Sequence, residues 1–318
     1  MLFRSRPELM NFVSHTYSAV CHGVALQHID AAFAYLVEDK LIYRLENSED
    51  AVAATRLGRT VSFAGLSAES GALFGAFLRS LISLSEKELQ REQGQQTYLQ
   101  RLRPMDFYAI CLASYEARRD VIDRKSFKPS ADALNEYIER LAPEDKPLLH
   151  LWRDPASGSY PTRRLLSTLR VQATEENSAY VRLMTAAAAL HEFSRSRKGA
   201  EEVAETWRLD IDFEGRLSPL IEWLLNGLTR ICTSDQCYRL DFLVPVIRSA
   251  GLDLVTGGGF GALLALDGVG IRSVETIKRA GYRSLAELRT LSATDLDAIN
   301  LSSRAKETVK RFLSRRSR

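Results

Sequence analysis

The segment RLSPLIEWLLNGLTRI, residues 216–231, decides the fold class. Its apolar residues recur every three or four positions, which is the spacing of one face of an α-helix. Similar stripes occupy most of the chain, including two that begin at Pro104 and Ser130. Only residues 41–55 resemble strands, on either side of a charged turn at residues 47–50. The sequence therefore predicts a mainly α protein with one small antiparallel ribbon.

The order of these segments predicts three parts. Two short helices, near residues 12–21 and 26–37, precede the ribbon, and a further helix follows it, which is the order of a winged helix at residues 1–85. Residues 86–254 hold five apolar helical stripes and are predicted to form a helical bundle. Residues 255–318 form a compact tail of short helices.

Glycine marks two of the expected boundaries. We expect Gly58 to end the ribbon, because glycine adopts a positive φ at little cost. The run GGGFG at residues 257–261 opens the tail. Gly257, Gly259 and Ala262 match the spacing of a dinucleotide-binding fingerprint, but the βαβ unit and the acidic residue that this site needs are missing. A flexible linker is the favoured interpretation.

The tail carries the most specific local motif, LDGVG followed ten residues later by AGYRSL. This pattern is typical of a helix-hairpin-helix, in which Gly268 and Gly270 allow a tight turn and aim backbone N–H groups at a phosphate. We assign Arg272 and Lys278 to the same DNA contact. Such a contact reads the nucleic-acid backbone and not the bases. The alternative is an αα-hairpin in which glycine only interrupts the helices.

Charge is distributed unevenly along the chain. The 318 residues include 43 Lys and Arg against 40 Asp and Glu, which gives a formal net charge of +3. Residues 265–318 hold 12 basic and six acidic residues, so the rest of the chain carries a net charge of −3. A positive field at one end favours a polyanionic partner.

Arg216 and Trp223 form a second candidate site. They are seven residues apart, which is two helical turns and hence one face. A guanidinium and an indole on one face can stack on the bases of a single strand whatever their identity. Pro219 lies in the first turn, after a cap at Asp212 or Phe213, so it does not break that face. The alternative is that Trp223 belongs to the hydrophobic core.

Several enzyme classes lack their motifs here. The chain contains no Gly-Lys dipeptide, so it has no Walker A loop, and no Asp-Glu dipeptide, so it has no DExx box. The five histidines show no metal-ligand spacing, and no Gly-x-Ser-x-Gly motif is present. We therefore expect no ATPase site, no other catalytic residue, no metal site and no cofactor in this chain.

Composition and cysteine usage bear on location. With 45% hydrophobic and 26% charged residues, the chain has the composition of a globular protein. No apolar stretch approaches the roughly 20 residues that a bilayer requires, and the N-terminus lacks the apolar region of a secretory signal. The four cysteines are scattered, which is typical of reduced thiols. We expect a cytoplasmic protein that does not span a membrane.

This order of parts resembles the region after the motor domains of superfamily-two DNA helicases that have a ratchet domain, namely the archaeal fork-repair helicases and the helicase half of DNA polymerase theta. The likeness covers nearly the whole chain. Residues 7–12, 41–42, 55–59 and 66–67 are similar to the winged helix, Arg216 with Glu222-Trp223-Leu224 to the ratchet helix, and residues 266–284 to the terminal helix-hairpin-helix domain. The chain departs from the family at Ile271, where family members often carry a basic residue; Arg272 follows.

The resemblance implies a DNA-binding function in a helicase, and the sequence leaves open whether its context is DNA repair or antiviral defence. In that family two RecA-like domains hydrolyse ATP, and the ratchet helix stacks an Arg and a Trp on the translocating strand. Arg216 and Trp223 then become contacts to single-stranded or forked DNA. ATP and Mg²⁺ would bind a RecA-like motor, supplied in cis by a longer helicase or in trans by a partner subunit.

Two alternatives stay open at this point. The chain could be a non-catalytic helical scaffold that recruits a motor or a nuclease. The hairpin alone would also suit a DNA glycosylase, with Asp295 or Asp297 as its acid.

Overall fold

The computed structural model describes ten stretches of the chain. They are residues 8, 11, 26–45, 51–88, 101–153, 165–170, 178–195, 198–234, 238–264 and 266–314. The helix expected near residues 12–21 lies outside the described residues, as do Arg315, Arg316 and Arg318 of the basic tail.

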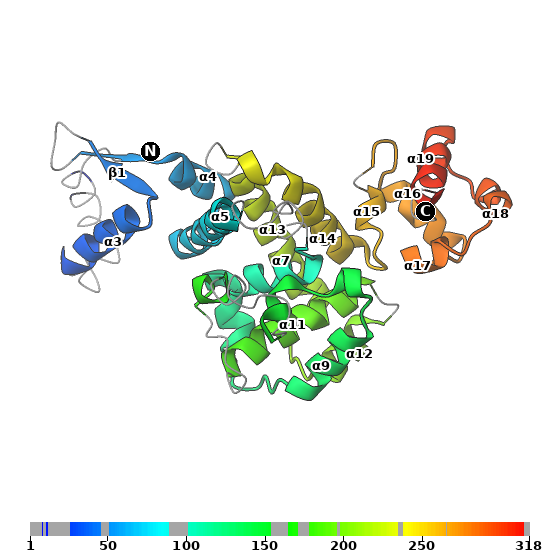
Figure 1. The fold of residues 1–318 in the computed structure, drawn as a ribbon, viewed down its shortest axis with the longest axis horizontal. Helices are drawn as coiled ribbons and strands as arrows, with labels where there is room; N and C mark the ends of the chain where they lie inside the picture. The colour runs from blue at the N-terminus through cyan, green and yellow to red at the C-terminus, as the bar shows by residue number, and fades with distance from the viewer. Residues whose placement is uncertain are drawn as a thin grey trace.

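Helices dominate the described residues, which confirms the predicted mainly α class. The N-terminal elements are α3 (Leu26–Glu38), β1 (Ile42–Arg44), β2 (Val52–Ala54), α4 (Arg56–Ala64) and α5 (Ala68–Glu88). The central elements are α7 (Pro104–Leu112), α8 (Tyr115–Ala117), η1 (Arg118–Ile122), α9 (Ala131–Arg140), η2 (Pro143–Asp145), η3 (Leu148–Arg153), α11 (Ser178–Arg195), α12 (Ala200–Trp207), η5 (Phe213–Leu217), α13 (Ser218–Cys232), η6 (Tyr238–Leu243) and α14 (Val244–Thr256). The tail holds α15 (Gly261–Leu264), α16 (Ile271–Arg279), α17 (Leu285–Leu288), α18 (Ala293–Ala298) and α19 (Ser303–Ser314). Figure 1 shows α3 and β1 at one end of the long axis and the tail helices at the other.

The expected ribbon is present, but Gly58 does not end it. Strands β1 and β2 pair antiparallel, with Ile42 opposite Ala54. Gly58 lies inside α4, which the sequence analysis did not predict as a helix. Thr55 caps this helix by accepting a hydrogen bond from the Gly58 N–H at 3.0 Å. A Cβ at position 58 would stand 2.0 Å from the carbonyl oxygen of Leu41, so glycine permits close packing here and not a positive φ.

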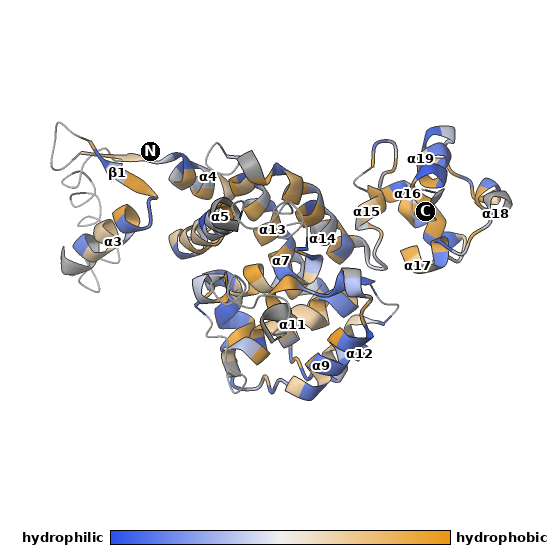
Figure 2. Ribbon diagram, in the orientation of Figure 1, coloured by the Kyte–Doolittle hydropathy of each residue, from blue (hydrophilic) through white to orange (hydrophobic). Residues whose placement is uncertain are grey.

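The buried side chains form two separate hydrophobic cores. The larger core runs from Leu41 to Leu254 and the smaller one from Phe260 to Val309. Helix α11 crosses the larger core, where its buried alanine run, residues 186–189, allows close packing against α7. Apolar residues colour much of α7 and α13 in Figure 2, whereas α12 and α19 carry more polar residues. The predicted bundle and tail therefore each have a core of their own, while α4 and α5 share the core of the bundle.

The glycine run between the two cores is not a flexible linker, contrary to the prediction. The Gly259 N–H donates to the Ser194 carbonyl at 2.9 Å, and the Leu285 N–H donates to the Gly258 carbonyl at 2.8 Å. A Cβ at Gly258 would lie 2.3 Å from the carbonyl oxygen of Arg283. The first contact joins the glycine run to the end of α11, and the second joins it to the tail; glycine is needed for the close approach at Gly258 and for the φ of +73° at Gly259.

None of the helices in the described part of the chain combines the length and the apolar character needed to cross a bilayer.

Candidate nucleic-acid interface

Arg216 lies in a π-helical turn, η5, immediately before α13. Asp212 caps this turn through a hydrogen bond from the Gly215 N–H at 2.8 Å, as the sequence predicted for one of two caps. Pro219 occupies the first turn of α13, where its missing N–H costs little. The Arg216 side chain is 53% exposed, and its Nη2 lies 2.5 Å from Oδ2 of Asp120 in η1. The guanidinium is thus at the surface and has a carboxylate partner.

Trp223 is half-buried and lies beside the end of α4. Its indole N–H donates to the carbonyl of Ala64 at 3.2 Å, and a Cβ at Gly65 would lie 3.8 Å from its Cζ2. The ring also packs against the edge of the larger core. The neighbouring Phe63 is 83% exposed, the highest value among the large apolar residues of the described chain. Trp223 is therefore an edge residue with a fixed orientation, not a sealed core residue.

Trp223 lies on the less buried side of α13, and Arg216 lies just before that helix, in η5. The opposite side enters the core through Ile221, Leu224, Leu225, Leu228 and Ile231. Trp223 is partly buried and Arg216 exposed, so both side chains border solvent.

The predicted hairpin leaves the start of α16 open. Gly268 adopts φ +90°, and a Cβ there would approach the Arg304 side chain to 2.8 Å, so glycine is required. Gly270 is the N-cap of α16, and a Cβ at that position would meet no atom within 4 Å. Ile271 and Arg272 are exposed in the first turn. The Ser273 N–H already donates to the Gly270 carbonyl at 2.9 Å, so this end of α16 offers the N–H groups of Ile271 and Arg272 to an anion.

Lys278 lies near the opposite end of α16 and has a structural partner. Its Nζ donates to the carbonyl of Thr256, near the end of α14, and lies 5.7 Å from the centre of the Phe260 ring. Burial lowers the pKa of this ammonium, although the charge of Glu275 opposes the shift. The side chain thus helps to dock the tail on the bundle.

A cavity of about 680 Å³ opens between the bundle and the tail. The start of α13, the end of α14 and the loop after α16 line it. Its charged lining residues are Lys198, Lys278, Arg283, Glu214 and Glu222. Three cations from separate segments therefore converge beside the helix that carries Trp223.

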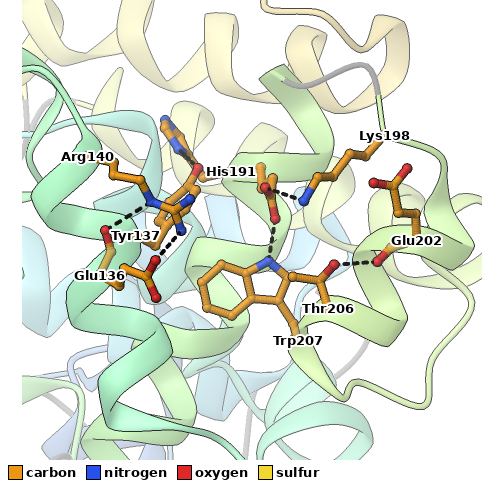
Figure 3. A network of polar contacts seen from close by, with 9 residues as sticks. Glu136, Tyr137, Arg140, His191, Lys198, Glu202, Thr206 and Trp207 are labelled. Atoms are coloured by element: carbon orange, nitrogen blue, oxygen red, sulfur yellow. Dashed lines mark hydrogen bonds and ion pairs between the residues drawn. The ribbon is translucent and has the colours of Figure 1, made fainter.

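Lys198 is held at this cavity by a network within the bundle (Figure 3). Its Nζ lies 3.0 Å from Glu192, which also accepts the indole N–H of Trp207 at 2.7 Å. The Trp207 and Tyr137 rings pack edge to face, and the Tyr137 hydroxyl lies 2.8 Å from Nδ1 of His191. The cation is thus connected to the packed interior of the protein.

A second cavity of about 750 Å³ also borders both parts of the molecule. Arg103, Arg195 and Arg289 line it together with Asp145 and Asp253. Arg195 and Asp145 form an ion pair at 3.2 Å. Burial raises the pKa of Asp253 to about 7, although the Gly261 N–H and Arg195 oppose the shift.

The structure gathers some of the predicted residues and separates others. Arg216 and Trp223 lie on the consecutive segments η5 and α13, and Lys278 lines the cavity beside α13. Gly268 and Gly270 lie at the other end of α16, so the hairpin is a separate surface.

Sequence reasoning missed Asp120 and Phe63. The Asp120–Arg216 contact joins residues 96 positions apart, which no local pattern reveals. Phe63 is exposed because α4 turns it away from the core. The sequence signal for this was that Phe63 falls on the polar side of a nine-residue amphipathic segment.

Metal-binding geometry is not seen in the described residues, where no three His, Cys, Asp or Glu side chains gather as ligands.

Comparison with known proteins assigns no family to this chain. No protein-family model matches it, and no curated protein has significant sequence similarity to it.

Proposed function

We propose that this chain is the nucleic-acid-binding part, or an accessory subunit, of an ATP-dependent superfamily-two DNA helicase. In this proposal residues 1–85 act as a winged helix, residues 86–254 as a ratchet domain and residues 255–318 as a helix-hairpin-helix domain. A RecA-like motor, in cis or in trans, binds ATP and Mg²⁺. The chain itself grips single-stranded or forked DNA during translocation.

One observation carries the proposal: a guanidinium and an indole on two consecutive helical segments, η5 and α13, both border solvent. Arg216 is exposed, and Trp223 is only half-buried. The hydrogen bond to Ala64 fixes the orientation of the indole, which lowers the entropy lost when a base stacks on its exposed part. Stacking of this kind does not depend on base identity, which is what a translocating protein needs.

The neighbouring cavity supports the same function. Lys198, Lys278 and Arg283 lie on its walls opposite two acids, Glu214 and Glu222, and the surplus of basic residues favours the phosphates of a strand that passes between bundle and tail. Further phosphates can reach the open start of α16 at Gly270. Base stacking on α13 and phosphate contacts on the tail would then act on one strand.

The decisive test is equilibrium binding of a fluorescently labelled oligothymidylate, followed by anisotropy. Trp223→Ala should weaken binding by roughly 1 to 3 kcal/mol, because a stacking surface is lost. Trp223→Phe should recover part of that loss, since a smaller aromatic ring remains. Affinity should also fall steeply as salt rises, because phosphate contacts release counterions.

Tyr43→Ala is the matched control, because Tyr43 is also an exposed aromatic residue but lies on β1. Circular dichroism verifies that each variant keeps its helices. Unchanged affinity in a folded Trp223→Ala protein would remove the stacking role.

A non-catalytic scaffold is the second candidate, and one observation favours it. Both side chains already have partners within the chain, Asp120 for Arg216 and Ala64 for Trp223. A scaffold that recruits a motor or a nuclease would show no oligonucleotide binding even at low salt. The same anisotropy assay therefore separates the two functions.

A further inference from the structure

Two π-helical turns meet at the surface of the bundle. In the part of the chain that the structure describes, this wider turn occurs at η1 and at η5. Such turns are rare and are frequent at functional sites. Here each contributes one charged side chain to a single ion pair, in which Nη2 of Arg216 lies 2.5 Å from Oδ2 of Asp120.

The framework around Asp120 is rigid. Arg182, from α11, donates through Nε to the Ile122 carbonyl at 2.5 Å and through Nη1 to the Phe127 carbonyl at 2.7 Å. Its remaining nitrogen, Nη2, donates to the Arg124 carbonyl. The backbone that follows Asp120 is therefore held from inside the bundle.

A further contact joins the segments that flank the two turns. Nη1 of Arg124, two residues after η1, donates to the carbonyl of Asp210 at 2.9 Å, just before η5. The turn that carries Asp120 is thus fixed relative to the turn that carries Arg216. Asp120 meets the guanidinium from a defined position, not as a mobile surface acid.

The chemistry of this ion pair leaves Arg216 able to bind. A guanidinium is planar and has five N–H donors, of which the Asp120 contact uses one. A hydrogen bond to a carboxylate lies at the edge of that plane, whereas stacking uses its faces. With the side chain 53% exposed, Arg216 can stack while Asp120 holds its edge.

We propose that Asp120 is a positioning residue for the contact between Arg216 and a base of single-stranded DNA. It fixes the guanidinium before the strand arrives, so less side-chain entropy is lost on binding. This inference rests on the proposed function, because it assigns a role at the same site.

Charge alone predicts the opposite effect, which makes the inference testable. A carboxylate beside a polyanion repels it, so removing an acid that does nothing else should strengthen binding. Removing a positioning residue should weaken binding. The sign of the change therefore distinguishes the two roles.

The experiment compares Asp120→Asn with Asp123→Asn in the full-length chain, with a labelled oligothymidylate as probe. Asp123 is the matched control, because it ends the same turn, is exposed and pairs with Arg118 at 3.4 Å. Both variants change the net charge equally. We expect Asp120→Asn to weaken binding about three- to tenfold, which is the usual size of coupling between contacting residues. We expect Asp123→Asn to bind as tightly as the wild type or more tightly.

A double-mutant cycle separates positioning from a general structural effect. In an Arg216→Lys background the planar group is gone, so Asp120→Asn should cause no further loss of affinity. Asp120→Glu keeps the carboxylate and should recover part of the binding. An effect of Asp120→Asn that persists in the Arg216→Lys protein would contradict the inference.

The outcomes also separate this inference from the proposed function. If the wild type does not bind the oligonucleotide, or if Trp223→Ala and Arg216→Ala bind as well as the wild type, the proposed function fails and this inference fails with it. If those two variants weaken binding but Asp120→Asn behaves like Asp123→Asn, only the role of Asp120 is overturned.

Discussion

His191 illustrates how one buried side chain makes stability depend on pH. Its Nδ1 lies 2.8 Å from the Tyr137 hydroxyl, and its Nε2 lies 3.4 Å from Nη1 of Arg195. Burial, with a smaller effect from the charge of Arg195, lowers the pKa of His191 from 6.5 to about 3. As pH falls, the unfolded chain therefore takes up a proton on this residue before the folded protein does. The contribution of His191 to stability is complete above about pH 6.5 and is lost towards pH 3.

We predict that the pH dependence changes in His191→Gln. Between pH 7 and pH 5 the free energy of unfolding should fall by about 2 kcal/mol more in the wild type than in the variant, because the histidine linkage is absent from the variant. Urea unfolding at the two pH values measures this difference. Burial raises the pKa of Asp106 to about 6 and that of Asp253 to about 7, so both carboxyls act in the opposite sense. Both carboxyls are present in the wild type and in the variant, so their effects on stability cancel in the comparison. If the free energy of unfolding changed with pH by the same amount in both proteins, the prediction would be contradicted.

At the scale of elements, close backbone approach determines where α4 lies. The helix packs against the chain at Leu41, immediately before β1, and glycine at position 58 makes this approach possible. The helix ends at Gly65, which has φ +72° and lies beside Trp223. The position of α4 therefore also sets the surroundings of the candidate stacking residue.

We predict that Gly58→Ala destabilises the protein although alanine is the better helix former. Helix propensity favours alanine by about 1 kcal/mol. The new Cβ would collide with the Leu41 carbonyl, and a clash of this kind costs about 1 to 3 kcal/mol or more. Chemical unfolding measures the net effect. Gly251→Ala is the control, because Gly251 also lies inside a helix, α14, and its Cβ would come no closer than 3.7 Å to a neighbouring side chain; equal stability of both variants would show that α4 adjusts freely.

At the scale of the whole molecule, the junction between the two cores decides whether the tail is docked or only tethered. The Gly258 carbonyl accepts from Leu285, and Lys278 reaches back to Thr256. A fixed junction keeps the cavity between bundle and tail at one width. A DNA strand that passes through the cavity would then meet the basic residues of both walls at a constant distance.

We predict that Gly258→Ala releases the tail. Its Cβ would lie 2.3 Å from the Arg283 carbonyl, so the backbone contact to Leu285 should break and the radius of gyration in small-angle scattering should rise. Gly257→Ala is the matched control: Gly257 also has a positive φ, of +63°, but its Cβ would meet nothing within 4 Å. Identical scattering curves for the two variants would contradict a docked tail.

Local patterns in the sequence predicted much of the helical structure and part of the candidate site. The stripes that begin at Pro104 and Ser130 became α7 and α9, because a helix depends on neighbours three and four residues apart. The seven-residue spacing of Arg216 and Trp223 predicted two α-helical turns between them, but Arg216 lies in the wider π-helical turn η5, which the spacing did not reveal.

The sequence by itself thus determined the helical class, the small ribbon and the helix that carries Trp223. Only the tertiary structure decided that Asp120 holds Arg216, that Ala64 holds Trp223 and that Gly258 docks the tail. Hydrophobic periodicity acts within one or two turns of chain, whereas these contacts join backbones and side chains that are far apart in sequence. Their geometry exists only after the cores have packed.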